Sequence, residues 1–300
     1  MKQLILLSSI LAVIGFSSCV KDAVTKPGID IAINKTTFNV GDTAKFTISG
    51  LPYNLVFYSG ETGNDYYSRN MYTASGGVTS MVFNTALAAA AGSSTATNLK
   101  ILVSNNFSGN YNKTEIEAAN WTDVTNMVTV PGNNQTIGLD PYKVDGKPIY
   151  VAFRFQTVDE TKTQRQVTVS NFSIKTVFPG QTFTNASNVY FAGFASFDFA
   201  GDAANFWNIP VTSNTNNSFT HRLVPANSEK DDDWAISKGF YTNTITPSTG
   251  IALKALSSNP VTDHSYVFTK AGTYKVVFAA SNNNITDTKE VVKEFSVTVN

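Results

Sequence analysis

Cysteine, histidine and charged residues are all scarce in this sequence. Its 300 residues include one cysteine, Cys19, and two histidines, His221 and His264. A single cysteine excludes an intramolecular disulfide, so burial of apolar side chains must stabilise the fold. Charged residues make up 15% of the chain, against a typical value of about 25%. The surface must therefore be polar mainly through amides and hydroxyls.

The charges that are present balance, with 22 basic and 22 acidic residues. No basic cluster follows the first residues, which argues against nucleic acid as a partner. A neutral, amide-rich surface suits neutral ligands such as glycans. The same composition is common in exported all-β proteins, so it does not establish such a ligand.

Long hydrophobic runs are absent, and the longest is the segment from Leu4 to Phe16. It is shorter than the roughly 20 residues that a membrane-spanning helix needs. A lysine precedes this run, and two serines and Cys19 follow it, a pattern that resembles the signal peptide of bacterial lipoproteins. The resemblance implies cleavage before Cys19 and lipid chains that anchor this residue to a membrane. The alternative is a soluble secreted protein with an incidental thiol.

Val20 follows the cysteine, so the sequence carries no aspartate signal for retention in the inner membrane. We therefore expect the outer membrane, with the protein facing the cell exterior. The next residues are polar and are interrupted by Pro27 and Gly28, which is typical of a tether between lipid and fold.

Apolar residues alternate with polar ones near both ends of the folded chain, as in β-strands with one buried face. The first set is Ile29, Ile31, Ile33, Ala44, Phe46 and Ile48, and the second is Tyr274, Val276, Phe278, Phe295, Val297 and Val299. The segments FNVGDTAKFTISG and HSYVFTKAGTYKVVFAAS resemble the first and last strands of PKD domains, which are immunoglobulin-like modules. The central tryptophan-containing motif of those modules is replaced here by residues 56–61.

An immunoglobulin-like sandwich needs about 100 residues, and neither terminal segment is that long. We therefore predict one split domain, because insertions at exposed loops are well tolerated. The predicted divisions are a signal peptide (1–18), a lipidated tether (19–28), the first half of the PKD-like domain (29–66), an inserted domain (67–232) and the second half (233–300). The alternative is two separate immunoglobulin-like domains at the two ends.

The inserted segment also alternates, most strongly at Ile149, Val151, Phe153 and Phe155. The succession LKILVSNNFSGNY, NWTDVT, KPIYVAFRF and VTVSNFSI resembles jelly-roll domains of bacterial adhesins and carbohydrate-binding modules. The predicted fold class is thus all-β, with an immunoglobulin/PKD-like sandwich and a jelly-roll β-sandwich.

From the signal segment through FYSGETGNDYYSR to about Ser173, the chain resembles the lipoprotein family named domain of unknown function 5017. The resemblance implies a surface lipoprotein of Gram-negative bacteria that is an accessory to Sus-type glycan-uptake systems. Binding of an extracellular polysaccharide is therefore the leading functional hypothesis, with glycan-uptake proteins as further partners. An adhesive or structural role toward protein partners is the alternative.

Sugar binding requires a planar ring for the apolar face of a pyranose, together with polar groups for its hydroxyls. Trp121 matches a strand position of the jelly roll and is expected in the core, whereas Trp207 is either an exposed ligand contact or a buried anchor. Trp234 is also open to a core or interdomain role. The glycan-binding candidates are Phe206, Trp207, Asn208, Tyr66, Tyr67, Arg69 and Trp234.

The split-domain hypothesis predicts that residues 60–69 and 231–234 meet where the two domains join. Carboxylates that converge there could bind calcium, which takes six to eight oxygen ligands. The weak calcium candidates are Glu61, Asp65, Asp231, Asp232 and Asp233. A solvated acidic turn is the alternative, and no other cofactor is expected.

Catalytic motifs are missing from the sequence, which has neither G-x-S-x-G nor H-E-x-x-H. We therefore expect no enzymatic activity. A glycoside hydrolase remains a lesser alternative, because it needs only two suitably spaced carboxylates.

Overall fold

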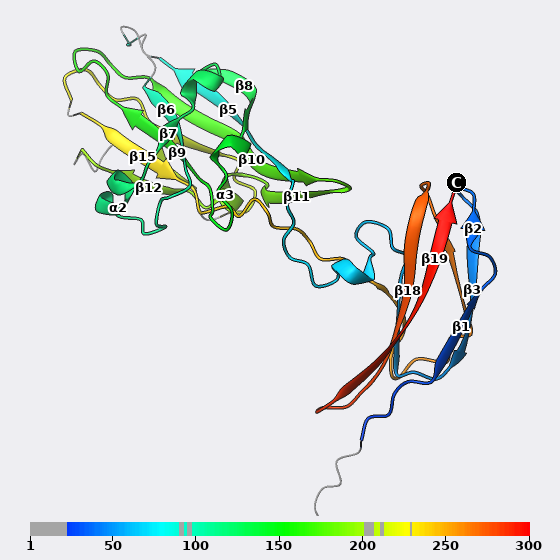
Figure 1. Cartoon of the computed structure of the whole chain (residues 1–300). Helices are drawn as coiled ribbons and strands as arrows, with labels where there is room; N and C mark the ends of the chain where they lie inside the picture. Colours follow the sequence, from blue (N-terminus) through cyan, green and yellow to red (C-terminus); the bar gives the residue numbers. More distant parts are fainter. Residues whose placement is uncertain (1–22, 90–92, 95–97, 201–206, 211–212, 229) are drawn as a thin grey trace, which may run out of the picture. The chain divides into compact units, whose positions relative to one another are not determined.

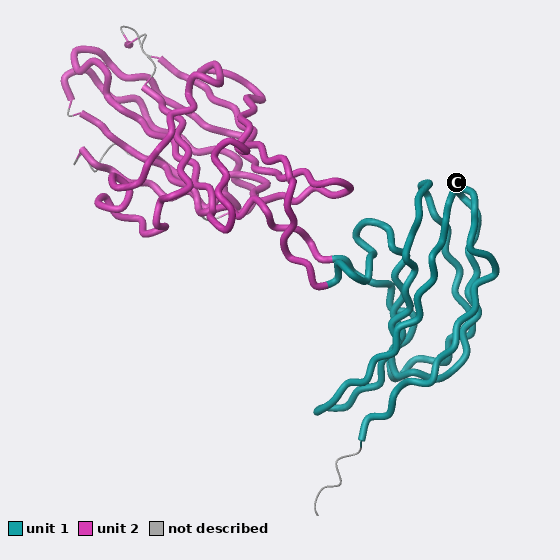
Figure 2. The backbone as a smooth tube through the Cα atoms, viewed as in Figure 1, with its two compact units in different colours: residues 1–69, 248–300 teal, residues 70–247 magenta. Residues whose placement is uncertain are grey.

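The computed structural model describes residues 23–89, 93–94, 98–200, 207–210, 213–228 and 230–300. The chain forms two compact units (Figures 1 and 2). Unit 1 comprises residues 1–69 and 248–300, and unit 2 comprises residues 70–247. The signal segment and Cys19 lie outside the described residues.

Unit 1 contains a three-stranded and a five-stranded sheet. In order, the first consists of β1 (Ile29–Ile33), β3 (Thr43–Gly50) and β17 (Asp263–Val267). The second consists of β16 (Ile251–Lys254), β4 (Asn54–Tyr58), β18 (Gly272–Asn283), β19 (Thr288–Val299) and β2 (Thr37–Phe38). Strand pairs β3–β17 and β4–β18 join the N-terminal segment to the C-terminal one.

The core of unit 1 lies between these two sheets. Phe46 of β3, Phe57 of β4 and Phe278 of β18 are almost completely buried. The Phe278 ring centroid lies 5.0 Å from those of both Phe46 and Phe57. The alternating apolar residues of both terminal segments therefore supply a single core.

Unit 2 is built from a six-stranded and a five-stranded sheet. The first has the order β13 (Trp207–Asn208), β14 (Ser218–His221), β10 (Gln166–Phe178), β5 (Val78–Ala88) and β8 (Gly132–Gly138), with β11 (Gln181–Ala186) also paired to β10. The second has the order β12 (Ala195–Asp198), β15 (Asp232–Ile236), β9 (Tyr150–Gln156), β6 (Leu99–Ser104) and β7 (Thr122–Asp123). The short helices are α2 (Lys113–Ala118) and α3 (Val189–Ala192), with 3-10 turns η2 (Tyr66–Ser68, in unit 1), η3 (Thr125–Met127) and η4 (Asp140–Tyr142).

Strand β9 shows how the five-stranded sheet of unit 2 is covered on both faces. Phe153 faces the six-stranded sheet, with its ring centroid 5.4 Å from that of Phe83 and 5.5 Å from that of Phe219. Tyr150 and Ala152 point to the opposite face and belong to a separate buried cluster. The five-stranded sheet thus has an inner face in the sandwich core and an outer face with its own apolar cover.

The predicted all-β class is confirmed, and both units consist mostly of antiparallel sheets packed as sandwiches. One predicted boundary needs correction, because residues 233–247 were assigned to the terminal domain. They belong to unit 2, where β15 pairs with β9 and β12. Within the described part of the chain, no helix has the length and apolar character needed to cross a membrane.

Candidate functional site

A row of four side chains crosses the outer face of the five-stranded sheet in unit 2. Strand register places Phe197 of β12 opposite Trp234 of β15, Trp234 opposite Arg154 of β9, and Arg154 opposite Lys100 of β6. Side chains alternate between the two faces of a strand, so these residues lie on the face opposite the sandwich core. The row therefore combines aromatic rings with cationic groups.

Trp121 lies directly before β7 and packs on Trp234. Their ring centroids are 5.4 Å apart, with an interplanar angle of 58°. The Trp121 indole donates a hydrogen bond to the Ile116 carbonyl of α2, at 2.9 Å. Trp234 is only 5% exposed, whereas Trp121 remains partly exposed. Trp121 is thus the ring that presents a surface, and Trp234 supports it from below.

Arg154 and Asp232 fix the polar side of this aromatic pair. The Arg154 guanidinium donates two hydrogen bonds to the Asp232 carboxylate, at 2.7 and 2.5 Å. Its Cζ atom also lies 4.9 Å from the Trp234 ring centroid, and the Trp234 indole donates to Asp232 Oδ1 at 3.1 Å. Bidentate charge-assisted pairs of this kind are geometrically specific. The side chains beneath Trp121 are therefore held in place before any ligand arrives.

Two cavities with shared lining residues lie beside β6 and β7, at the Lys100 end of this row. One has a volume of ≈ 380 Å³ and is lined by Trp121, Trp234, Arg154 and neighbouring residues. The other has a volume of ≈ 620 Å³ and is lined by residues of β6, β7 and the segment 125–130. It lies at the edge of the sandwich, because its lining includes Leu99 of the sandwich core and Val128 and Val130, which pack against that core. Lys100 and Asp123 line both, and their charged atoms lie 4.0 Å apart. We call the combined depression the outer-sheet groove.

The outer-sheet groove offers the two kinds of contact that sugars need. Trp121 supplies a ring, while Lys100, Asp123 and Asn126 supply polar groups along the groove. The Lys100 and Asp123 side chains are 49% and 47% exposed, so a ligand would reach both. Pockets of about 300–1,000 Å³ with a few convergent polar groups are typical of small-ligand sites.

The expected glycan contact around Trp207 is not supported by its position. Trp207 is 1% exposed and belongs to the core of unit 2, where its indole donates to the Asp233 carbonyl at 3.1 Å. Trp207 was predicted to be either an exposed ligand contact or a buried anchor, and in the structure it is a buried anchor. Asn208 is exposed on β13, and Phe206 lies outside the described residues.

Tyr66, Tyr67 and Arg69 lie together in unit 1 around η2. Tyr66 is 8% exposed, and its hydroxyl donates to Glu290 at 2.5 Å. Burial and this bond raise the pKa of Tyr66 to about 12. The Arg69 guanidinium lies 3.6 Å from the Tyr66 ring centroid. Tyr66 therefore has no free face for a sugar.

Tyr67 is the more exposed of the two tyrosines, at 52%. Its hydroxyl donates to Glu294, and the Lys275 ammonium lies 5.1 Å from its ring centroid. The hydrogen bond from Tyr67 and the ion pair with Lys275 lower the pKa of Glu294. The Tyr67 hydroxyl is thus engaged within unit 1, whereas part of its ring remains exposed.

The expected calcium ligands are divided between the two units. Glu61 accepts a hydrogen bond from Tyr266 and Asp65 caps η2, both within unit 1. Asp231, Asp232 and Asp233 lie at or within β15 of unit 2. Among the described residues, no group of three or more histidine, cysteine, aspartate or glutamate side chains is placed to hold a metal ion.

His221 and Asp233 form a pair inside the sandwich core. His221 Nε2 lies 2.8 Å from Asp233 Oδ2, and both side chains are 0% exposed. Phe155 stacks on the imidazole, with ring centroids 3.7 Å apart. A histidine–carboxylate pair is a common catalytic arrangement, but a pair closed off from solvent offers no path for a substrate. We therefore assign the His221–Asp233 pair a structural role in the core of unit 2.

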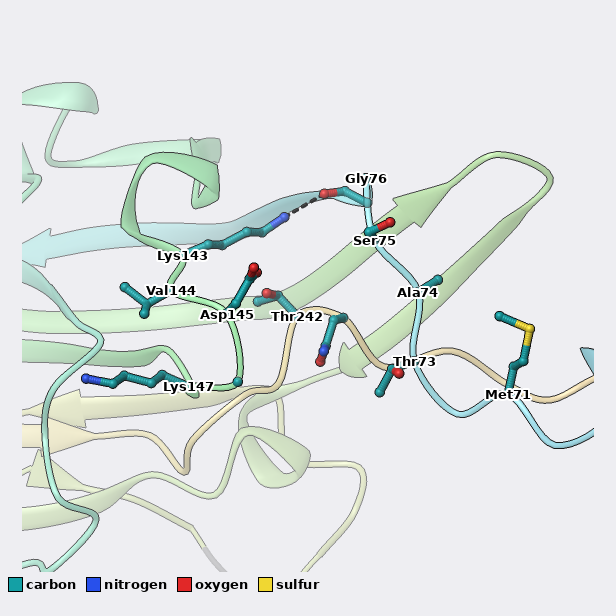
Figure 3. Close-up of a pocket in the computed structure, with 13 residues that line it drawn as sticks. Met71, Thr73, Ala74, Ser75, Gly76, Lys143, Val144, Asp145, Lys147 and Thr242 are labelled. Atoms are coloured by element: carbon teal, nitrogen blue, oxygen red, sulfur yellow. Dashed lines mark hydrogen bonds between the residues drawn. The ribbon is translucent and has the colours of Figure 1, made fainter.

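A second cleft in unit 2, of ≈ 540 Å³, is lined by the segments 71–77, 143–147 and 242–243 (Figure 3). Lys143 crosses its edge and donates to the Gly77 carbonyl at 2.6 Å. Asp145 and Thr242 supply further polar groups, and Met71 supplies an apolar one. The residues that line this cleft include no aromatic ring, so the cleft lacks the flat surface that favours pyranose stacking.

Sequence reasoning missed most of the outer-sheet groove. Trp121 was expected in the core, and Lys100, Asp123 and Arg154 were not considered. Arg154 does carry a signal, because it interrupts the apolar strand KPIYVAFRF. Only Trp234 was among the predicted candidates, and its burial makes it a support for Trp121.

Unit 2 is thus a β-sandwich with an aromatic and charged groove on one outer face. The chain belongs to the family described as Domain of unknown function (DUF5017), whose family model matches residues 18–194, more than half of the sequence. The match includes Lys100, Trp121, Asp123 and Arg154, whereas Trp234 lies beyond it. No curated protein and no solved structure matches the chain.

Proposed function

We propose that this protein is a non-catalytic surface lipoprotein that binds an extracellular polysaccharide in the outer-sheet groove. The observation that carries the proposal is the Trp121–Trp234 pair, held by Arg154 beside the Lys100–Asp123 pair. It presents a partly exposed indole on a rigid strand surface. A site built on strands holds its geometry better than one built on loops.

The shape of the groove favours a polymer over a monosaccharide. Its two cavities follow one another and share Lys100 and Asp123, so a ligand that stacks on Trp121 continues past both charged groups. Hydroxyls of a neutral glycan would accept from Lys100 and donate to Asp123. The balanced charge of the chain fits a neutral ligand as well.

The cellular setting of the proposal rests on the N-terminal sequence. A lipid anchor on Cys19 would hold the protein at the outer membrane with its units toward the cell exterior. There it would bind glycan chains as an accessory to a glycan-uptake system, with the proteins of that system as partners. This part of the proposal depends on Cys19, which lies outside the described residues.

Affinity electrophoresis with a panel of polysaccharides tests the binding proposal. The soluble chain from residue 23 onward is run beside Trp121→Ala and beside Phe191→Ala, which removes an exposed ring of α3 outside the groove. We expect at least one polysaccharide to retard the wild type and Phe191→Ala, but not Trp121→Ala. Equal mobility of all three proteins in every polysaccharide would reject the proposal.

One observation favours a second function, glycoside hydrolysis, because Glu117 and Asp123 both line the cavity that contains Trp121. A hydrolase needs one carboxyl that stays protonated, usually through burial. Glu117 and Asp123 are instead 56% and 47% exposed, and each faces a lysine ammonium. Release of reducing ends by the wild type, abolished in Glu117→Gln, would favour hydrolysis over simple binding.

A further inference from the structure

Four large apolar side chains are exposed at one end of unit 1. Leu51 is 69% exposed, Tyr53 42%, Leu256 66% and Ile285 102%. They lie on three different connections, which follow β3, β16 and β18. We call these four residues the tether-end patch. Exposed apolar residues gathered on one surface mark sites of interaction with proteins or membranes.

Hydrogen bonds hold the three connections together. The Tyr53 amide donates to Asn282 Oδ1 of β18 at 2.8 Å. The Lys254 ammonium, at the end of β16, donates to the Tyr53 carbonyl at 3.3 Å. These contacts join the Tyr53 loop to the two elements that lead to Leu256 and Ile285.

The turn that carries Ile285 has its own internal support. Asn284 Oδ1 accepts hydrogen bonds from the amides of Thr286 and Asp287, both at 2.9 Å. Asparagine commonly closes turns in this way, and Ile285 in this turn is fully exposed. Ile285 therefore projects from the tip of the β18–β19 hairpin without packing on its own unit.

The chain enters unit 1 at this same end. Asn282 Nδ2 donates to the Thr25 carbonyl at 3.1 Å, and a Cβ atom added at Gly50 would lie 2.1 Å from the Gly28 carbonyl oxygen. In Figure 1 the blue start of the described chain and the turn between β18 and β19 lie at one end of unit 1, and the C-terminus lies at the other. Thr25, six positions after the predicted lipid anchor, is thus hydrogen-bonded to the base of the hairpin.

The short tether limits how far this end can move from the anchor. Thr25 follows Cys19 by six positions, and an extended chain of about 3.5 Å per residue covers about 20 Å over that distance. A lipidated Cys19 therefore keeps the hairpin base within about 20 Å of the membrane interface. Two nearby lysines already have partners, because Lys289 pairs with Asp287 at 3.0 Å and Lys254 donates to the Tyr53 and Ala255 carbonyls. The patch therefore offers a membrane apolar contact rather than positive charge.

We infer that the tether-end patch lies on the lipid surface, with Ile285 and the two leucines in the headgroup–acyl boundary and Tyr53 at headgroup level. The inference rests on the lipid anchor proposed for Cys19. Unit 1 would then contact the membrane at two places, through the lipid chains and through its own side chains, which limits its rotation about the tether. Burial of the patch would add its own binding free energy to that of the lipid chains.

Site-directed spin labelling of the mature lipidated protein tests this contact. Lipidation occupies the only native thiol, so Ile285→Cys provides a unique labelling site. Lys270→Cys is the matched control, because Lys270 is exposed in the turn before β18, at the opposite end of this strand from Ile285. Both proteins are reconstituted in vesicles of phosphatidylethanolamine and phosphatidylglycerol, and collisions with oxygen and with a nickel chelate are measured.

We expect the label at position 285 to collide more with oxygen and less with the chelate than the label at 270. Equal, water-like values at both positions in vesicle-bound protein would overturn the inference and leave the anchor intact. Spin–spin broadening at position 285 would place a second copy of the chain on the patch and also overturn it. Failure of the vesicles to retain either protein would reject the anchor and the inference together, whereas glycan binding is measured separately.

Discussion

The Trp121 ring lies on Trp234, with 5.4 Å between the ring centroids, and only Trp121 keeps an exposed surface. In the proposed glycan site the two indoles have different tasks, because Trp121 would contact the sugar and Trp234 supports Trp121. Their hydrogen bonds differ as well, since Trp121 donates to the backbone of α2 and Trp234 to Asp232. The groove is therefore tied to both a helix and a strand.

Substitution separates these two tasks. Trp234→Ala should lower the free energy of unfolding by about 3 kcal/mol or more, as expected for truncation of a buried tryptophan. Trp121→Ala should cost clearly less, because its ring is partly exposed, yet it should abolish retardation by the polysaccharide. Urea denaturation followed by affinity electrophoresis measures both effects. An equal loss of stability in the two variants would contradict this division.

Lys100→Ala should weaken glycan binding without affecting the fold. The Lys100–Asp123 pair is exposed and its charged atoms are 4.0 Å apart, and such surface pairs contribute about 0–1 kcal/mol to stability. Loss of one hydrogen bond to a ligand hydroxyl should raise the dissociation constant about tenfold, which corresponds to about 1.4 kcal/mol. Isothermal titration calorimetry checks this value. Lys35→Ala, which removes an exposed, ion-paired lysine of unit 1, serves as the control.

The buried His221–Asp233 pair predicts strong non-additivity. His221→Leu leaves the Asp233 carboxyl buried without its partner, and removal of one member of such a pair costs about 3–5 kcal/mol. The double variant His221→Leu/Asp233→Leu removes the orphaned carboxyl and should recover part of that loss. Urea denaturation of the single and double variants measures the coupling. This account of the pair is wrong if the double variant loses more free energy of unfolding than His221→Leu and Asp233→Leu lose together.

The same carboxyl predicts a pH dependence of stability. Burial raises the pKa of Asp233 in the folded protein, although the hydrogen bond from His221 acts in the opposite direction. The folded state thus holds a proton that the unfolded chain releases above about pH 4, so the contribution of Asp233 falls as the pH rises through its folded pKa. The stability difference between the wild type and Asp233→Asn should therefore decrease from pH 4 upward. An increase over this range would contradict the predicted sign.

Alternation of apolar residues was enough to predict the all-β class, because strands with one buried face have a period of two. The run Ile149–Phe155 was predicted as a strand on that basis and forms most of β9. The same rule does not show that Tyr150 and Ala152 on its other face are buried beneath a second apolar cluster. That cover comes from elements distant in the sequence, which periodicity does not detect.

The candidate site was less predictable for the same reason. Asp233 was predicted either as a weak calcium candidate or as part of a solvated acidic turn, but the register of β15 directs it into the core opposite His221 of another sheet. The groove depends on pairing of β6, β9 and β15, which brings Lys100, Arg154 and Trp234 into one row. A short sequence pattern does not reveal how distant strands pair. A charged residue within an apolar strand, such as Arg154, does indicate that one face of the strand lies outside the sandwich core.

Nuclear magnetic resonance of the indole N–H groups tests the central claim most directly. The chain has three tryptophans, so three side-chain signals report on the groove and on the core in one spectrum. On addition of a polysaccharide that retards the protein, we predict that the Trp121 signal shifts most, Trp234 less, and the buried Trp207 not at all. Binding that leaves the Trp121 signal in place would contradict the assignment of the outer-sheet groove as the glycan site.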